Sequence, residues 1–248
     1  MRPLLVVMRL DLYLVMHGMV TSRTEAKNFI TEGAVTVNSK VVKKPAFDVP
    51  EEGASVAVDT SSKRFASRGG LKLEAALEKF GVSVEGRYAI DIGASSGGFT
   101  DCLLKRGAKH VIAVDSGHSQ LVKCLSSDER VTSLENYNAR YLSSEDLEYA
   151  PDIAVMDVSF ISATYIIPKV YSVLAAGGDF ICLIKPQFEV GRSNIGKNGV
   201  VTDEKCRKMA VEKVIFSAES VGFSFVSHIK SPILGGDGNV EYLAHFKK

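Results

Sequence analysis

The chain has 248 residues, of which 46% are hydrophobic and 24% charged, with 30 Lys and Arg against 29 Asp and Glu. This ordinary globular composition excludes the collagen-like, low-complexity and natively disordered classes. The four scattered cysteines form no C-x-x-C pair, so we expect neither a metal site nor a disulfide-rich secreted scaffold. Arg9 and Asp11 interrupt the apolar N-terminal run, which predicts a cytoplasmic protein with no signal peptide and no membrane contact. A start at Met8 would leave residues 1–7 outside the native chain.

The front of the chain has the pattern of a small α+β module. Residues 9–17 predict a short amphipathic helix, and the capping-box spacing of Ser22 and Glu25 predicts the start of a second helix. Beyond Gly33, residues 34–42 predict a hairpin with turn residues at its tip.

A strand at 56–58 would complete the small sheet of this module, and the polar stretch that follows has no periodicity. We therefore predict a first domain at residues 8–59, a linker at 60–66 and a second domain at 67–248.

In the second domain, apolar runs alternate with helical stretches. Continuous apolar strands separated by helices imply an α/β fold with a mostly parallel sheet covered on both faces. The short connection at 231–240 suits an antiparallel pair of strands at one edge of the sheet. The predicted strands are 88–92, 110–115, 131–134, 152–157, 179–185, 224–230 and 241–246.

The segment 89–101 is the most informative, because an apolar strand runs into a Gly-rich turn and then into a helix. The spacing of its glycines is neither G-x-G-x-x-G nor a P-loop, which disfavours a dinucleotide or nucleotide triphosphate site. Asp91 and Asp115 end adjacent parallel strands beside these glycines, where open α/β sheets bind ligands and an acidic residue commonly takes ribose hydroxyls. A tight turn with no ligand is the alternative.

The residues after the fourth and fifth strands bear on the reaction. The Asp-Pro-Pro-aromatic turn typical of adenine amine methylation is missing, since Val158 follows Asp157, and no Cys follows a Pro as cytosine carbon methylation requires. A ribose hydroxyl needs a general base, and a Lys serves only when its ammonium form is destabilised. Lys72, Asp157, Lys185 and Glu241 could supply such a set. Taken alone, Lys185 could be a surface lysine at a strand end, and Lys72 alone fits a surface lysine better than a catalytic one.

Six short motifs follow one another along the chain, and their order is more informative than any single motif. They are Ser67-Arg-Gly-Gly-Leu-Lys-Leu73, Asp91-Ile-Gly-Ala-Ser-Ser-Gly-Gly-Phe-Thr100, Asn138-Ala-Arg140, Asp157-Val-Ser-Phe-Ile161, Lys185-Pro-Gln-Phe-Glu189 and Gly238-Asn-Val-Glu241. Together they resemble the bacterial haemolysin A-like family of FtsJ-like ribosomal RNA ribose methyltransferases. The front module resembles the S4-type RNA-binding domain that those proteins carry.

This resemblance implies a Rossmann-like methyltransferase fold that uses S-adenosylmethionine. It implies that Lys185 is the general base, that Asp157 and Lys72 position it, and that Glu241 orients the group. The cofactor-binding residues that it implies are Asp91, Gly93, Ser95, Gly97, Gly98, Phe99, Asp115 and Asn138.

It also implies ribosomal RNA or ribosomal subunits as the partner, and residues 1–72 carry a modest basic excess of 11 Lys and Arg over 7 Asp and Glu. The residues that we expect to contact RNA are Arg9, Arg23, Lys27 and Arg68. The polar stretch 189–203 suits a mobile loop that orders on RNA, or merely a flexible connection.

Two other functions compete with the enzyme. An RNA-binding or regulatory protein on a silent methyltransferase scaffold would be expected to have a broken catalytic set or cofactor loop, and neither is broken here. A membrane-active haemolysin is argued against by the missing apolar span and the near-zero net charge.

Overall fold

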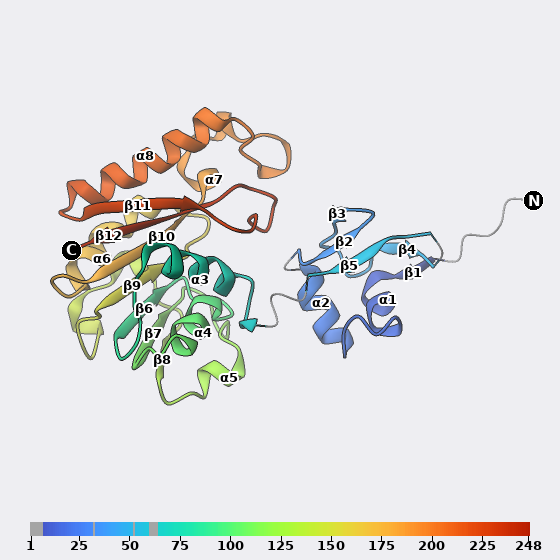
Figure 1. Cartoon of the computed structure of the whole chain (residues 1–248), viewed down its shortest axis with the longest axis horizontal. Helices are drawn as coiled ribbons and strands as arrows, with labels where there is room; N and C mark the ends of the chain where they lie inside the picture. Colours follow the sequence, from blue (N-terminus) through green and yellow to red (C-terminus); the bar gives the residue numbers. More distant parts are fainter. Residues whose placement is uncertain (1–6, 32, 52, 60–63) are drawn as a thin grey trace, which may run out of the picture. The chain divides into compact units, whose positions relative to one another are not determined.

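The structure is a computed structural model that describes residues 7–31, 33–51, 53–59 and 64–248. The chain divides into two compact units, Met1–Lys63 and Arg64–Lys248, and each is described by itself (Figure 1). Residues 1–6 and residues 60–63 of the predicted linker lie outside the described residues, whereas Val7 belongs to a strand. No helix within the described ranges is long and apolar enough to cross a membrane.

The first unit packs two helices against short strands. Its core includes the fully buried Leu10, Leu14, Ile30 and Val35. β2 is the central strand of a three-stranded antiparallel sheet, and β1 pairs with β4 in a second, two-stranded sheet that the sequence analysis did not predict. The elements are β1 (Val7–Arg9), α1 (Leu10–Met16), α2 (Arg23–Thr31), β2 (Val35–Val37), β3 (Lys40–Val41), β4 (Asp48–Pro50) and β5 (Val56–Val58).

Local sequence explains two features of this unit. The hairpin turn between β2 and β3 places Asn38 and Ser39 at φ values of 50° and 63°, as a type I′ turn requires. Ser22 caps α2 as predicted, because its hydroxyl accepts the amide of Glu25 at 3.1 Å. The Glu25 carboxylate, however, accepts the amide of Thr21 at 2.6 Å, one residue before the cap.

The second unit is built on a seven-stranded sheet of order β11-β12-β10-β9-β6-β7-β8. The five strands from β10 to β8 are parallel, and β12 runs antiparallel to both of its neighbours. This arrangement confirms the predicted fold class and the antiparallel edge. The strands are β6 (Tyr88–Ile92), β7 (His110–Val114), β8 (Val131–Leu134), β9 (Ile153–Met156), β10 (Asp179–Ile184), β11 (Ser224–Lys230) and β12 (Tyr242–Lys247).

Helices cover both faces of this sheet, and side chains alternate between the two cores. In β10, Ile181 and Leu183 face the core under α3, α4 and α5, whereas Phe180 and Cys182 face the core under α6 and α8 (Figure 1). The helices are α3 (Gly69–Phe80), α4 (Gly98–Lys105), α5 (Lys123–Ser126), α6 (Ile167–Val173), α7 (Pro186–Glu189) and α8 (Glu204–Ser220), with 3-10 turns at Ala139–Tyr141, Ser144–Asp146, Ala163–Tyr165, Arg192–Asn194 and Lys197–Gly199.

Candidate active site

Five neighbouring strands bring charged residues to the carboxyl edge of the sheet. Lys185 follows β10, Asp157 follows β9, Asp91 lies near the end of β6, and Asp115 follows β7. Glu241 reaches the same edge because it precedes the antiparallel strand β12, just beyond the last cross-strand pair of β10 and β12. The topology therefore gathers residues that are up to 150 positions apart in the chain.

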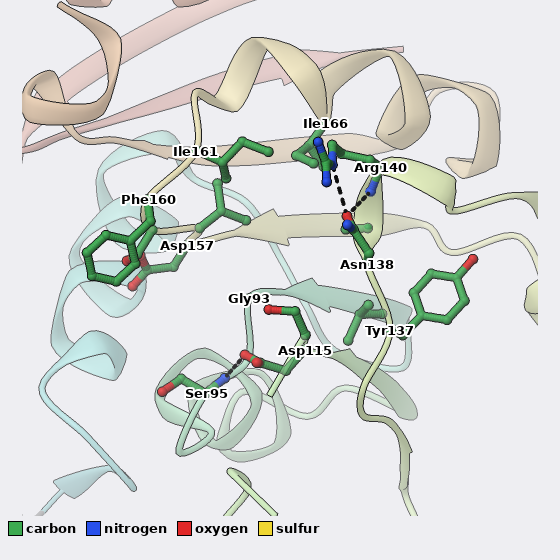
Figure 2. Close-up of a pocket in the computed structure, with 15 residues that line it drawn as sticks. Gly93, Ser95, Asp115, Tyr137, Asn138, Arg140, Asp157, Phe160, Ile161 and Ile166 are labelled. Carbon is green, nitrogen blue, oxygen red and sulfur yellow. Dashed lines mark hydrogen bonds between the residues drawn. The ribbon is translucent and has the colours of Figure 1, made fainter. Parts of the chain in front are cut away.

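A pocket of about 590 Å³ opens beyond the ends of β9, β6 and β7, and its size suits a small molecule such as a nucleoside derivative. Figure 2 shows Asp157 and Phe160 on one side of it and Tyr137 and Asn138 on the other. Of the predicted cofactor-binding residues, those in its wall are Gly93, Ser95, Asp115 and Asn138.

Two polar side chains of the pocket wall are fixed by backbone and side-chain donors. The carboxylate of Asp115 accepts the amide of Ser95 at 2.8 Å (Figure 2). It also accepts the amide of Gly117 at 2.7 Å. Each oxygen can accept a further hydrogen bond, so Asp115 is held in place and can still bind a ligand. The amide oxygen of Asn138 accepts the backbone N–H of Arg140 at 3.1 Å.

Gly93 forms the floor of the pocket at a point where no side chain fits. Its φ is +84°, and an added Cβ would lie 2.4 Å from the carbonyl oxygen of Asp157. The ends of β6 and β9 can approach this closely only because Gly93 has no side chain.

Four predicted cofactor residues lie outside the pocket wall, and three of them, Gly97, Gly98 and Phe99, belong to the start of α4 or the residue before it. Gly97 has φ +96°, and a Cβ there would meet Leu125 at 2.3 Å. A Cβ on Gly98 would meet the Ser67 hydroxyl at 2.2 Å, and Phe99 belongs to the core under α3 and α4. Their contacts shape the start of α4 rather than the wall of the pocket.

Asp91 lies beneath the Gly-rich turn and is completely buried. The Thr100 hydroxyl donates to its Oδ2 at 2.7 Å, whereas its Oδ1 has no hydrogen-bond partner among the described residues. The pKa of Asp91 is raised to about 7, mainly by burial and also by the nearby carboxylates of Asp157 and Asp115, while the Thr100 hydrogen bonds oppose the rise.

The four predicted catalytic residues form two Lys-carboxylate pairs. Lys185 Nζ lies 2.5 Å from Asp157 Oδ1 and donates to the Ser159 hydroxyl at 2.7 Å. Lys72, on α3, donates to Glu241 at 2.5 Å, and both of these side chains are at least nine-tenths buried. Strand alternation turns Asp157, Lys185 and Glu241 toward the side of the sheet that α3, which carries Lys72, covers. The Lys72–Glu241 pair is buried, whereas the Lys185–Asp157 pair is partly exposed.

Gly235 leaves room for the Glu241 side chain, because a Cβ added at position 235 would lie 2.2 Å from Glu241 Oε1. Asn239, two residues before Glu241 in the chain, is also buried. It accepts the amide of Val201 and donates to the carbonyl of Gly199, both at 2.9 Å. The stretch 189–203, predicted as a mobile loop or a flexible connection, thus contains two 3-10 turns and is anchored near its end.

Phe160 is an exposed aromatic residue at the pocket that the sequence analysis did not single out. Its side chain is 93% exposed, its φ is +63°, and its ring lies 5.4 Å from that of Phe188. A large aromatic residue in the turn after Asp157 was the available signal, but its exposure depends on the unusual backbone conformation.

The predicted RNA-contacting residues differ in their surroundings. Arg9 and Arg23 pair with the fully buried Asp11, at 2.9 and 3.0 Å, while the two arginine side chains stay about half exposed. Hydrogen bonds from Arg9, and then from Arg23, lower the pKa of Asp11 to about 2 against its burial. Lys27 is exposed on α2, and Arg68 is half-buried at the start of α3.

Comparison with known proteins assigns this arrangement to a family. The FtsJ-like methyltransferase family matches residues 65–248. The chain belongs to this family. As an FtsJ-like methyltransferase, it uses S-adenosylmethionine, and its residues 8–54 match the S4 domain family. The predicted family, enzyme class and cofactor are therefore confirmed.

Similar proteins extend over nearly the whole of this methyltransferase. It is 42% identical to the 16S/23S rRNA (cytidine-2'-O)-methyltransferase TlyA of Mycobacterium tuberculosis, over 94% of this chain and 87% of that protein. It is 43% identical to Hemolysin A of Brachyspira hyodysenteriae, over 96% of this chain and 99% of that protein. A solved structure described as a "putative hemolysin" from Streptococcus thermophilus has a TM-score of 0.77 and 43% identity, over 99% of this chain and 90% of that chain.

The pocket residues fit the cofactor of the family. Asp115 offers carboxylate oxygens with remaining acceptor capacity, which suit ribose hydroxyls. Gly93 keeps the floor of the pocket free of a side chain, and the pocket opens toward the Lys185–Asp157 pair through Asp157, which is part of its wall.

Proposed function

We propose that this protein transfers a methyl group from S-adenosylmethionine to a ribose 2'-hydroxyl of ribosomal RNA. The observation that carries this proposal is the pair of Lys-carboxylate contacts, Lys185 with Asp157 and Lys72 with Glu241, at the strand ends beside the pocket. A hydroxyl is a weak nucleophile, so an enzyme that methylates it gains from a basic side chain at the reacting oxygen.

Lys185 is the residue that we assign to the 2'-hydroxyl proton. Its amine, in the neutral form, accepts the proton as the oxygen attacks the methyl group, and it becomes an ammonium that Asp157 stabilises at 2.5 Å. The Ser159 hydroxyl accepts a hydrogen bond from the same nitrogen and fixes its direction. Lys72 and Glu241 form a buried pair whose opposite charges cancel. The pair therefore adds side chains but no net charge to the part of the site that would receive the ribose.

On the cofactor side, S-adenosylmethionine supplies an activated methyl group when it is bound. Asp115 would accept hydrogen bonds from the ribose hydroxyls, and Asn138 would contact the nucleoside from the opposite wall. Ser95, whose amide already holds Asp115, keeps this carboxylate at the mouth of the pocket.

The RNA substrate follows from the S4 domain and from the relatives. Residues 8–54 match the S4 domain family. The TlyA relative, which is similar to nearly the whole chain, is named as a methyltransferase of cytidine 2'-oxygens in 16S and 23S rRNA. We infer that the protein works in the cytoplasm on ribosomal subunits. The exposed ring of Phe160 is suited to stack on an unpaired base next to the reacting ribose.

The test uses ribosomal subunits from a strain that lacks the protein. Purified protein and cofactor with a labelled methyl group are added, and incorporation into 16S and 23S rRNA is measured separately. Alkaline hydrolysis then maps the site, because a methylated 2'-oxygen cannot attack the adjacent phosphate and the chain stays intact there. Label in an alkali-sensitive position would contradict ribose methylation. No incorporation into either subunit would favour an RNA-binding protein on a silent scaffold.

A further inference from the structure

A buried carboxylate outside the pocket wall connects two segments of the active site. Glu189 is the last residue of α7, four positions after Lys185, and is only 7% exposed. Its Oε1 accepts the backbone N–H of Ala163 at 2.7 Å, and its Oε2 accepts the hydroxyl of Ser162 at 2.5 Å. Lys213, from α8, donates to the same carboxylate at 3.1 Å.

The two segments that Glu189 joins are those that carry the Lys185–Asp157 pair. Ser162 directly follows the stretch 158–161, which forms one wall of the pocket and begins right after Asp157. Glu189 itself belongs to the short helix that begins directly after Lys185. Its hydrogen bonds therefore fix the segment after β9 against the segment after β10.

The charge on Glu189 is required for this connection. A carboxylate has two oxygens that accept, and here each oxygen meets a donor from a different residue. A glutamine of the same shape could accept the Ala163 amide with its oxygen and donate to the Ser162 hydroxyl, but its NH₂ group would then face the Lys213 ammonium, which cannot accept a hydrogen bond. Lys213 supplies the balancing positive charge and also donates to the Glu189 carbonyl at 2.9 Å, which ties α8 to the same point.

We propose that Glu189 is a positioning residue for methyl transfer, which holds the 158–161 wall and the Lys185–Asp157 pair in their working geometry. This inference rests on the proposed function. Glu189 lies outside the pocket wall, so its effect on cofactor and substrate passes through Ser162 and Ala163. Displacements of about 1 Å at reacting groups can reduce rates by about 100-fold, so a connection of this kind affects turnover.

The test compares Glu189→Gln with Glu212→Gln in the full-length protein. Glu212 is an exposed residue of α8 whose only ion pair among the described residues is a long contact of 3.8 Å with Lys208, so it controls for the same chemical change on a neighbouring surface. Three quantities are measured: the affinity for S-adenosylhomocysteine by calorimetry, the rate of methyl transfer per folded molecule, and amide hydrogen exchange in residues 158–163.

For Glu189→Gln we expect exchange at the Ala163 amide to become about tenfold faster and cofactor-product affinity to fall about tenfold. Methyl transfer should fall by up to about 100-fold. Glu212→Gln should match the wild type in all three measurements. A Glu189→Gln protein that is less stable but has wild-type affinity, exchange and rate would overturn the proposal, since Glu189 would then serve folding alone.

Ser162→Ala keeps the proposal testable should Glu189→Gln fail to fold, because it removes one donor and leaves the carboxylate in place. It should change the same three quantities in the same direction by a smaller factor, and wild-type behaviour in all three would contradict the proposal. In the double variant with Glu189→Gln the two effects should be less than additive. Failure of the wild type to methylate rRNA would refute the proposed function, yet affinity and exchange would still decide the role of Glu189.

Discussion

Buried carboxylates lie both at the amino ends of the strands of the seven-stranded sheet (the amino edge) and at their carboxyl ends (the carboxyl edge). The hydrogen-bond partners of these carboxylates differ between the two edges. At the amino edge, Asp179 receives a hydrogen bond from Arg87 at 2.7 Å and one from His245 at 2.7 Å, and it pairs with Lys247 at 2.8 Å. Burial raises the pKa of Asp179, but these hydrogen bonds outweigh it and hold the pKa well below the usual range.

At the carboxyl edge, Asp91 is equally buried but receives one side-chain hydrogen bond, from Thr100, and its pKa is raised to about 7. Asp115 keeps acceptor capacity on the pocket wall. The comparison teaches that the carboxylate with a full set of partners stabilises this fold, whereas those with acceptor capacity to spare lie in the pocket wall or beneath the Gly-rich turn beside it.

The largest effect is expected at the carboxyl edge, from Lys185. Lys185→Ala should reduce methyl transfer by about 100- to 10,000-fold, the range of general-base catalysis, with little change in cofactor affinity. Lys185→Arg should be nearly as inactive, because a guanidinium keeps its proton and cannot act as a base. Single-turnover transfer and calorimetry measure both. Substantial turnover by the Arg variant would assign the proton to another group.

At the amino edge, the expected effect is on stability alone. Asp179→Asn removes the negative charge from beside Arg87, His245 and Lys247, so the free energy of unfolding should fall by about 3 kcal/mol. Urea denaturation measures this change. Activity per folded molecule should persist, and its loss at unchanged stability would show that the amino edge takes part in the function.

Asp115→Ala should weaken cofactor binding by about 1–3 kcal/mol, because it removes an acceptor for ribose hydroxyls. The same substitution also frees the amides of Ser95 and Gly117, so Asp115→Asn is the better matched variant, since it keeps one oxygen for them. Calorimetry with S-adenosylhomocysteine checks both variants. Unchanged affinity in both would remove Asp115 from the cofactor site.

Asp91 should give stability a pH dependence of opposite sign to that of Asp179. Its pKa is about 7 in the folded protein against 3.8 ordinarily, so between these values the folded state binds more protons than the unfolded chain. Its contribution to the free energy of unfolding therefore falls as pH rises, by at most about 1.4 kcal/mol from pH 5 to 6. Asp91→Asn should lack this fall in denaturation curves. Parallel curves for the two proteins would place the Asp91 pKa outside this window.

The sequence predicted the second unit well because its strands are continuous apolar runs. β6, β8 and β11 have the predicted bounds, β7 and β10 end one residue earlier than predicted, and β9 and β12 differ by one residue at each end. β1 and β4 were missed because each has three residues and exists through its pairing with a partner about 40 positions away, as Val7 with Pro50 shows. No local pattern encodes such a pair.

Within the site, residues that directly follow strands were predictable, and Asp115 and Asp157 indeed line the pocket. Contacts made by loops were not predictable in this way. Glu189 reaches Ser162 across 27 positions, and Phe160 is exposed through a positive φ that the sequence does not signal. Both depend on how two segments meet in space rather than on periodicity.

The smallest effect is expected in the first unit. There, two residues predicted to contact RNA differ in the same way, because Arg23 pairs with a buried carboxylate whereas Lys27 is exposed to solvent. Lys27 is exposed, so Lys27→Glu should lower RNA affinity modestly and reduce the slope of log affinity against log salt by about 1, with the thermal midpoint unchanged. Arg23→Glu should also lower the thermal midpoint, because the buried Asp11 would lose a partner and face a like charge. Binding to an rRNA fragment at several salt concentrations, with thermal denaturation in parallel, separates these effects. An unchanged salt slope for Lys27→Glu would show that this face of α2 does not contact RNA.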